Sequence, residues 1–210
     1  MLFRSELDVG GSVKLAGGSS GGTIEVGGVC KVEGDLKFDT LDVGGIVAIS
    51  GSAEGAEIDV GGKIEVDGSV ALSGTLEVGG KAEIDGDLKA QGVDVGGALR
   101  ARKVAAEQRV SVGGRIETDE GVYASYVKVG RRGRVRGLIK ADEVIVGKGA
   151  EVEDIDAKRI ILERDVSARS LRGETIRLEP GCRVSGDVHY TKELEAARDV
   201  SFTRAPEKAE

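Results

Sequence analysis

Side chains able to perform chemistry are scarce, and those present are not spaced to form a catalytic centre. The chain has one histidine and two cysteines among its 210 residues. His189 lies between Val188 and Tyr190, and if these two point inward, the alternation of a strand places the imidazole outside. Serine-nucleophile, P-loop and dinucleotide-binding motifs are missing from the sequence. We therefore expect a non-enzymatic protein without a cofactor or a small-molecule substrate.

The two cysteines, Cys30 and Cys182, occupy the same position in two copies of a sequence repeat that is described below. If each copy advances the chain by one strand spacing, the two thiols are about 40 Å apart. A disulfide needs Cα atoms within about 7 Å. We expect both cysteines to be buried core residues.

Six carboxylates recur at one position of the same repeat, where alternation makes them point outward. As a ladder of oxygen ligands they could hold a hard cation such as calcium. The interpretation we favour is a solvated acidic face, because exposed charges are common on proteins, and we expect no metal site. The six residues are Asp8, Glu25, Asp42, Asp59, Glu77 and Asp94.

Positive charge gathers in the middle of the sequence. Residues 99–140 carry 11 basic and 4 acidic side chains, whereas residues 1–98 carry 7 basic and 17 acidic ones. Residues 128–140 form a basic collar that could contact nucleic acid, acidic lipid or an acidic protein. A solvated face, or lateral pairing with the acidic end of another copy, is the alternative that we favour. The collar residues are Lys128, Arg131, Arg132, Arg134, Arg136 and Lys140.

The element that must position these residues is a repeat of 16–18 residues. Val-Gly-Gly recurs seven times between Val9 and Val112, and the series continues with modified corners to Leu178. Within each copy the apolar residues alternate, which is the period of a strand with one buried face. Glycine pairs suit tight corners because glycine reaches backbone angles closed to other residues.

Three short strands per copy predict an all-β, single-stranded solenoid, a triangular β-helix of about 12 turns of 16–18 residues. The varying repeat length and the lack of regular hexapeptides favour right-handed winding. Only residues 192–198 have a weak helical pattern. We expect a stub at residues 1–6, the β-helix at 7–202 and a charged tail at 203–210.

The ends of such a solenoid present unpaired strand edges, to which another copy can add. Solenoids that remain monomeric usually cover their ends with polar capping units, and we expect no capping helix here. The sequence therefore predicts end-to-end polymerisation of the protein with itself, without nucleotide. The expected joint residues are Phe3, Leu7, Val9, Val184, Val200 and Phe202.

The turns resemble those of bactofilins, a family of polymer-forming cytoskeletal proteins. The similarity is clearest in residues 163–188, which include Ile-Arg-Leu-Glu-Pro-Gly (176–181) and Val-Ser-Gly-Asp-Val (184–188). The resemblance implies a right-handed triangular β-helix and nucleotide-free filaments joined through apolar terminal turns. An adaptor module that binds an anionic partner through residues 128–140 is the alternative function.

The resemblance also implies membrane association. Some family members begin with methionine, an apolar residue and a cation, and Met1, Leu2, Phe3 and Arg4 are similar. A stub packed on the first turn remains an equal alternative. The sequence has no apolar run long enough to span a bilayer and no signal-peptide pattern. We expect a cytoplasmic protein. The resemblance implies, as an alternative, a peripheral position at the inner face of the membrane.

Overall fold

A computed structural model describes residues 6–209 of the chain. They are all-β: parallel strands stack as a β-solenoid of about 12 turns, and no helix occurs among these residues. The chain divides into two compact units, Met1–Ala105 and Ala106–Glu210. The solenoid predicted from the repeat is confirmed, whereas its right-handed winding stays a prediction.

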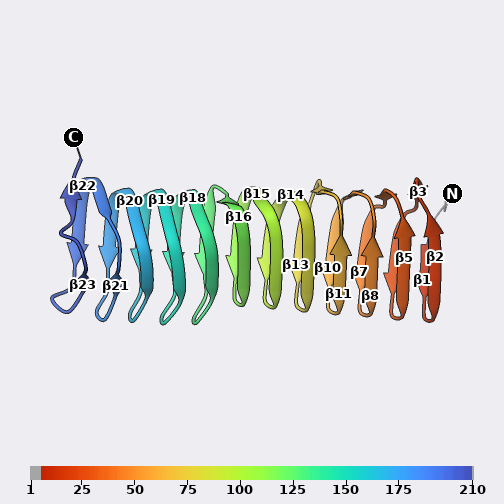
Figure 1. Cartoon of the computed structure of the whole chain (residues 1–210), viewed down its shortest axis with the longest axis horizontal. Coiled ribbons are helices and arrows are strands. Elements are labelled where there is room, and N and C mark those ends of the chain that lie inside the picture. The colour runs from red at the N-terminus through yellow and green to blue at the C-terminus, as the bar shows by residue number, and fades with distance from the viewer. Residues whose placement is uncertain (1–5, 210) are drawn as a thin grey trace. The chain divides into compact units, whose positions relative to one another are not determined.

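The first unit contains fourteen strands and the beginning of a fifteenth, which continues into the second unit (Figure 1). Most of them are two to five residues long, because a glycine-containing corner interrupts each turn. The strands are β1 (Glu6–Val9), β2 (Ser12–Ala16), β3 (Ser19–Ser20), β4 (Thr23–Val26), β5 (Val29–Glu33), β6 (Leu36–Lys37), β7 (Thr40–Val43), β8 (Ile46–Ile49), β9 (Ala53–Gly55), β10 (Glu57–Val60), β11 (Lys63–Val66), β12 (Val70–Leu72), β13 (Thr75–Val78), β14 (Lys81–Val95) and β15 (Ala98–Val112).

Three columns of parallel strands build the first unit, and each strand pairs with the one that occupies the same place in the next turn. One column runs β1–β4–β7–β10–β13 and ends on β14. A second runs β2–β5–β8–β11–β14, and a third runs β3–β6–β9–β12–β14. The valines that precede the glycine pairs therefore stack on one another inside the unit, where Val43 and Val60 have no exposed surface.

From the second turn of the first unit onward, the corners are too tight for a side chain at the second glycine of each pair. A Cβ atom built on Gly62 would lie 2.0 Å from the carbonyl oxygen of Gly45 in the turn before, and one on Gly45 would lie 2.0 Å from that of Gly28. The first glycine of the pair is different, since a Cβ on Gly61 meets nothing nearer than 3.8 Å. Close stacking of successive corners thus requires the second glycine.

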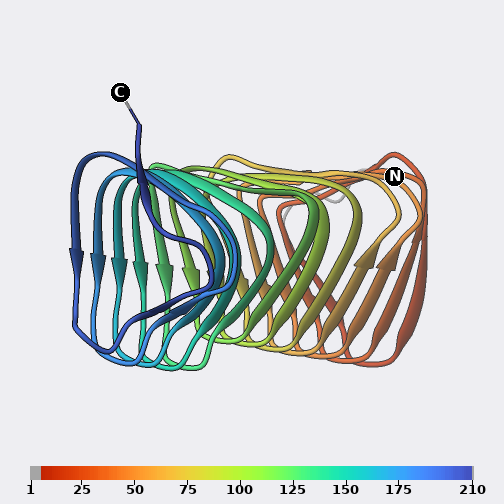
Figure 2. The same ribbon diagram turned by 60° about the vertical axis from the view of Figure 1, so that its left-hand side comes forward.

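The second unit repeats the three columns with longer strands, as its part of Figure 2 shows: successive turns follow nearly the same path. The strands from β18 to β20 run along more than one side of a turn without a break in strand structure. The strands are β16 (Arg115–Tyr123), β17 (Tyr126–Val129), β18 (Arg134–Val146), β19 (Glu151–Leu162), β20 (Ser167–Leu178), β21 (Arg183–Val184), β22 (Val188–Ala196), β23 (Ser201–Phe202) and β24 (Glu207–Lys208).

After the last glycine pair, Gly113-Gly114, the next four corners of the second unit place one residue in the left-handed region instead. Arg132 has a φ of 58° and Asp165 a φ of 61°, and glycines 149 and 181 occupy the equivalent places with φ of 68° and 79°. Asp and Gly tolerate this region better than most residues. These corners are longer than the glycine pairs, with four residues (130–133) between β17 and β18 where two residues (61–62) separate β10 from β11. They carry charged side chains such as those of Arg131 and Arg132.

Two segments near the end of the chain form strands that the sequence pattern did not predict. Residues 192–196, which have a helical pattern in the sequence, belong to strand β22 because Ile176 pairs with Leu194 and Leu178 with Ala196. Stacking on an existing edge therefore overrides a weak local preference. Within the segment 203–210, residues 207–208 form β24 on the edge of β22.

Candidate interaction surfaces

The first turn of the first unit offers one free strand edge. Strand β1 pairs with β4, β2 with β5 and β3 with β6, and for residues 6–209 no strand pairs with the opposite edge of these three. Among the predicted joint residues here, Leu7 is half-buried whereas Val9 is only 1% exposed. Leu7 is thus placed where it could touch another molecule, and Val9 can only support it. Phe3 lies outside the described residues, as do Met1, Leu2 and Arg4.

Within residues 6–209, the last turn of the second unit is the other edge, since β23 and residues 193–196 of β22 pair only with the turn before. Phe202 pairs with Val184 across β21 and β23, and it is half-buried while Val184 is 1% exposed. Val200 and Leu194 of the same turn are also half-buried. This turn therefore carries apolar side chains that only one neighbouring turn covers. Of the predicted joint residues, Phe202 and Val200 lie on this surface and Val184 lies beneath it.

A short segment after Phe202 covers part of this last turn. Arg204 Nη1 lies 2.7 Å from Asp187 Oδ1, and the backbone N–H of Ala209 donates to the carbonyl of Tyr190 at 2.8 Å. His189 Nδ1 lies 3.6 Å from Glu207 Oε2, and its side chain is 34% exposed. The histidine is therefore partly solvated beside a carboxylate, close to the position that alternation predicts.

The basic collar divides into paired and unpaired cations. Arg134 Nε donates to Glu151 Oε2 at 2.8 Å, and this hydrogen bond raises the pKa of the guanidinium and lowers that of the Glu151 carboxyl. Arg136 Nη1 lies 3.2 Å from Glu117. By contrast, within the part of the chain that the structure describes, the other four collar residues have no ion-pair partner. These four are Lys128, Arg131, Arg132 and Lys140.

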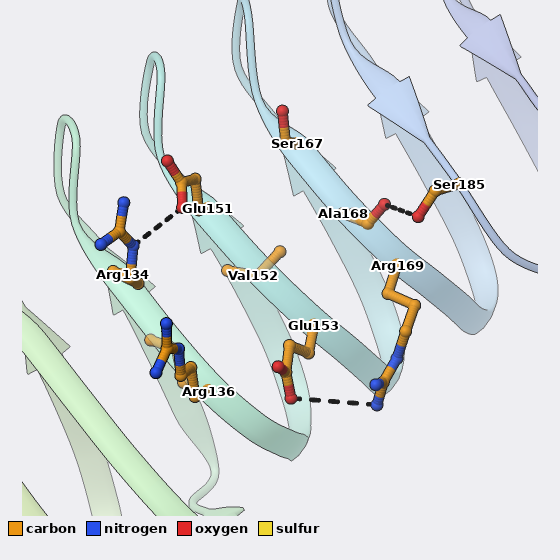
Figure 3. A pocket seen from close by; sticks show the side chains of 10 residues that line it. Arg134, Arg136, Glu151, Val152, Glu153, Ser167, Ala168, Arg169 and Ser185 are labelled. Atoms are coloured by element: carbon orange, nitrogen blue, oxygen red, sulfur yellow. Dashed lines mark hydrogen bonds and ion pairs between the residues drawn. The ribbon is translucent and has the colours of Figure 1, made fainter.

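Figure 3 shows an open groove on the strand face that carries Arg134 and Arg136. Small side chains, Ser167, Ala168 and Ser185, form part of its wall on the neighbouring turns. Its third arginine, Arg169, is held by Asp154, whose pKa is lowered mainly by this hydrogen bond. Each arginine of the groove thus already has a carboxylate partner, so the groove is not built to take an anion.

The ladder of six carboxylates exists as the repeat predicts. Asp8 pairs in register with Glu25, and the series continues through Asp42, Asp59 and Glu77 to Asp94. All six side chains are exposed. Glu6 and Glu57 lie two residues before ladder positions and are exposed on the same strand face, which we call the acidic face. Over the described range 6–209, none of these eight carboxylates has an ion-pair partner.

The remaining side chains that could perform chemistry are the two thiols and the groups that could bind a metal ion. Cys30 and Cys182 are 1% and 0% exposed, and burial raises the pKa of both thiols. Each is a free, buried cysteine, as the repeat predicts. The described residues contain no cluster of three or more His, Cys, Asp or Glu side chains with the geometry to hold a metal ion. Likewise, none of their secondary structure is a helix long and apolar enough to cross a bilayer.

No family model, curated protein or solved structure matches this chain. The repeat predicted the ladder and the buried cysteines. It missed the neutralisation of Arg134 and Arg136, because their acidic partners Glu151 and Glu117 are 17 and 19 residues away in sequence. That separation is one turn of the solenoid, so a search for opposite charges one repeat apart could have found them.

Proposed function

We propose that this protein is a non-enzymatic structural protein that polymerises end to end, without nucleotide, into cytoskeletal filaments or scaffolds, as the resemblance to bactofilins implies. The observation that carries the proposal is the pair of strand edges that no strand covers within residues 6–209, one on β1 and β2 and the other on β23 and residues 193–196 of β22. A parallel strand edge is a template on which another chain can continue the ladder. Association with a membrane through residues 1–4 is part of the same proposal.

The chemistry of the two edges supports this joint. The last turn presents Leu194, Val200 and Phe202, which are half-buried, and the first turn presents Leu7. Burying such side chains contributes roughly 1.5–3 kcal/mol for each one that goes from exposed to covered. Backbone hydrogen bonds between the edges would add directionality, since each solenoid turn already pairs with the next in parallel.

The test is electron microscopy and sedimentation of the purified protein without nucleotide. The wild type is expected to form filaments, and Phe202→Asp is expected to abolish them because a buried, unpaired charge in the joint costs several kcal/mol. Circular dichroism checks that the variant keeps the β-solenoid. Persistence of filaments in both Phe202→Asp and Val200→Asp would overturn the proposal.

The matched control is Ser201→Asp. Ser201 precedes Phe202 in β23, but its side chain is exposed and it pairs with Arg183 of the adjacent turn. The same charge placed here faces solvent and a cation, so filaments should be as long as those of the wild type. A loss of filaments in this control as well would mean that net charge, and not the apolar joint, governs assembly.

A second candidate function is an adaptor module that binds an anionic partner through the collar at residues 128–140. The observation in its favour is that Lys128, Arg131, Arg132 and Lys140 have no ion-pair partner within residues 6–209. This function predicts that Lys128→Glu removes binding to an anionic probe such as duplex DNA and leaves the oligomer size unchanged. Binding that is insensitive to salt would contradict it, because exposed charges are screened within about 10 Å at 0.1 M salt.

A further inference from the structure

The acidic face of the first unit carries one sign of charge and no partner. Its eight carboxylates lie on the outward side of a single column of strands, and the outward positions of that column contain no lysine or arginine. Adjacent ladder carboxylates are one strand spacing apart, about 4.8 Å between backbones. Like charges directly opposite one another on neighbouring strands are destabilising, so a cationic surface brought against this face would be favoured.

The second unit carries a complementary surface, which we call the basic edge. The corner residues Arg131, Lys148 and Arg164 belong to successive turns, since the N–H of Arg132 donates to the carbonyl of Lys148 at 3.1 Å and that of Gly149 to Arg164 at 3.0 Å. Arg132 shares the first of these corners. The basic edge consists of Arg131, Arg132, Lys148 and Arg164 with the neighbouring strand residues Lys128 and Arg177. Lys148 lies 3.5 Å from Asp165 and Arg177 lies 3.8 Å from Glu195, so the other four cations are the ones without an ion-pair partner within residues 6–209.

Two half-buried isoleucines lie next to the basic edge. In register order the outward residues of this column are Lys128, Ile145, Ile161 and Arg177. An apolar centre between charged ends has the composition of an interface, in which the core is depleted in charge and the rim is polar. The acidic face offers the corresponding small side chains at Thr23 and Thr40, whose positions alternate with the carboxylates.

From these two surfaces we infer that the acidic face of one copy docks on the basic edge of a second copy. Both surfaces belong to stacked parallel strands, so their charges repeat at the same interval and several pairs can form in one register. A nucleic acid or an anionic membrane would satisfy the basic edge alone and leave the acidic face unpartnered. A second copy satisfies both surfaces. This side contact is separate from the end-to-end joint and does not require it.

The experiment removes the end joint first. In the full-length Phe202→Asp chain, sedimentation velocity at about 50 mM salt reports side association without filaments. The acidic-face variant is Asp42→Lys with Asp59→Lys, and the basic-edge variant is Lys128→Glu with Arg132→Asp. The second change keeps the corner, because Asp165 has the same left-handed conformation in an equivalent corner, with a φ of 61°. Each variant alone should associate at least about tenfold more weakly, because like charges then face each other.

Mixing the two variants provides the decisive measurement. The acidic-face variant keeps an intact basic edge, and the basic-edge variant keeps an intact acidic face. These two intact surfaces can meet only in a mixture, so an equimolar mixture should associate as strongly as the unmodified end-blocked chain. The control Asp67→Lys with Asp85→Lys makes the same change of net charge at exposed residues outside the acidic face, and it should keep its self-association.

A mixture that remains as dispersed as its components overturns the inference, as does an end-blocked chain that stays monomeric at low salt. Association that appears only after duplex DNA or anionic vesicles are added overturns it too. Filament formation by the unblocked chain is read separately and tests the proposed function alone.

Discussion

At the scale of single residues, space at the corners decides which glycines the first unit needs. The second glycine of a pair stacks directly under the corner before it, whereas the first one has room for a side chain. The distinction is invisible in the sequence, where the two glycines look alike. It follows from the stacking of turns, because the clashing atom belongs to the residue 17 positions earlier.

We expect Gly62→Ala to destabilise the protein by about 1–3 kcal/mol, because its Cβ would meet the Gly45 carbonyl at 2.0 Å and the corner must shift. Gly61→Ala is the matched control. Its Cβ has ordinary contact at 3.8 Å, so its effect should stay within about 1 kcal/mol of zero. Urea unfolding followed by circular dichroism checks both, and equal effects of the two substitutions would contradict the stacking argument.

Ion pairs between turns give a second prediction at this scale. Arg169 Nε donates to Asp154 Oδ1 at 2.8 Å, and the pKa of Asp154 is lowered chiefly by this hydrogen bond. A depressed carboxyl pKa stabilises the fold above the unfolded value of about 3.9 and ceases to do so as the pH falls through the lower folded value. Arg169→Gln should therefore cost about 0.5–1 kcal/mol at pH 7, a small value because Arg169 is half exposed.

The same comparison at acid pH checks the sign. The difference in unfolding free energy between Arg169→Gln and the wild type should shrink as the pH falls from about 4 through the lower pKa of folded Asp154, because below that pKa the carboxyl is protonated in both proteins. Arg183→Gln serves as the control, since no ion pair of Arg183 occurs within residues 6–209. Its effect should be small at every pH. A difference for Arg169→Gln that grows toward acid pH would contradict the assignment.

At the scale of strands and turns, much of the structure was predictable from the sequence. Alternation placed Val43 and Ile49 inside and Asp42 outside, because a strand with one buried face has a period of two. The three-column stacking followed from the fixed repeat. What the sequence could not give was the conformation of the modified corners around Arg132 and Asp165, where the glycine signal is lost.

The ends were also harder to predict than the middle. Residues 192–196 have a weak helical pattern, yet the open edge of β20 makes them a strand. The segment around Glu207 has no apolar alternation, and its strand depends on backbone pairing with His189 and Tyr190. In both places the deciding interaction comes from the preceding turn, and local sequence carries little information about it.

Hydrogen exchange at the free edge of β23 provides a prediction at this scale. The N–H groups of Ser201 and Thr203 donate to the carbonyls of Cys182 and Val184 in the turn before, so alternation directs the N–H of Phe202 toward the open edge. Below the concentration needed for assembly, the Phe202 amide should exchange rapidly while those of β19 are protected. In sedimented polymer it should become protected.

Mass spectrometry of peptides that cover residues 199–204 measures this change. The control is a peptide within residues 151–162, because β19 pairs with strands on both sides and its exchange should not depend on assembly. Protection of the control peptide alone, with the edge still exchanging freely in the polymer, would exclude β23 from the joint.

At the scale of the whole molecule, the unequal distribution of charge matters more than the net charge of −7. Residues 1–98, with 7 basic and 17 acidic side chains, have a net charge of −10, and residues 99–140, with 11 basic and 4 acidic ones, have a net charge of +7. The proposed end joint is apolar, whereas the inferred side contact is electrostatic. The two modes of association should therefore respond differently to ionic strength.

We expect salt to separate the two modes in the wild-type protein. Raising the salt from about 50 mM to about 500 mM shortens the screening length from about 14 Å to about 4 Å. Charge pairs at the side contact should then weaken, so bundles seen by electron microscopy should become single filaments. Filament length should stay the same or increase, because apolar burial is not screened and the repulsion between copies falls. The Asp42→Lys, Asp59→Lys chain should form single filaments at both salt concentrations. The opposite result would be filaments that shorten at high salt while the bundles persist. It would mean that charges hold the end joint together and apolar side chains hold the side contact, which contradicts the roles given to Phe202 and Asp42.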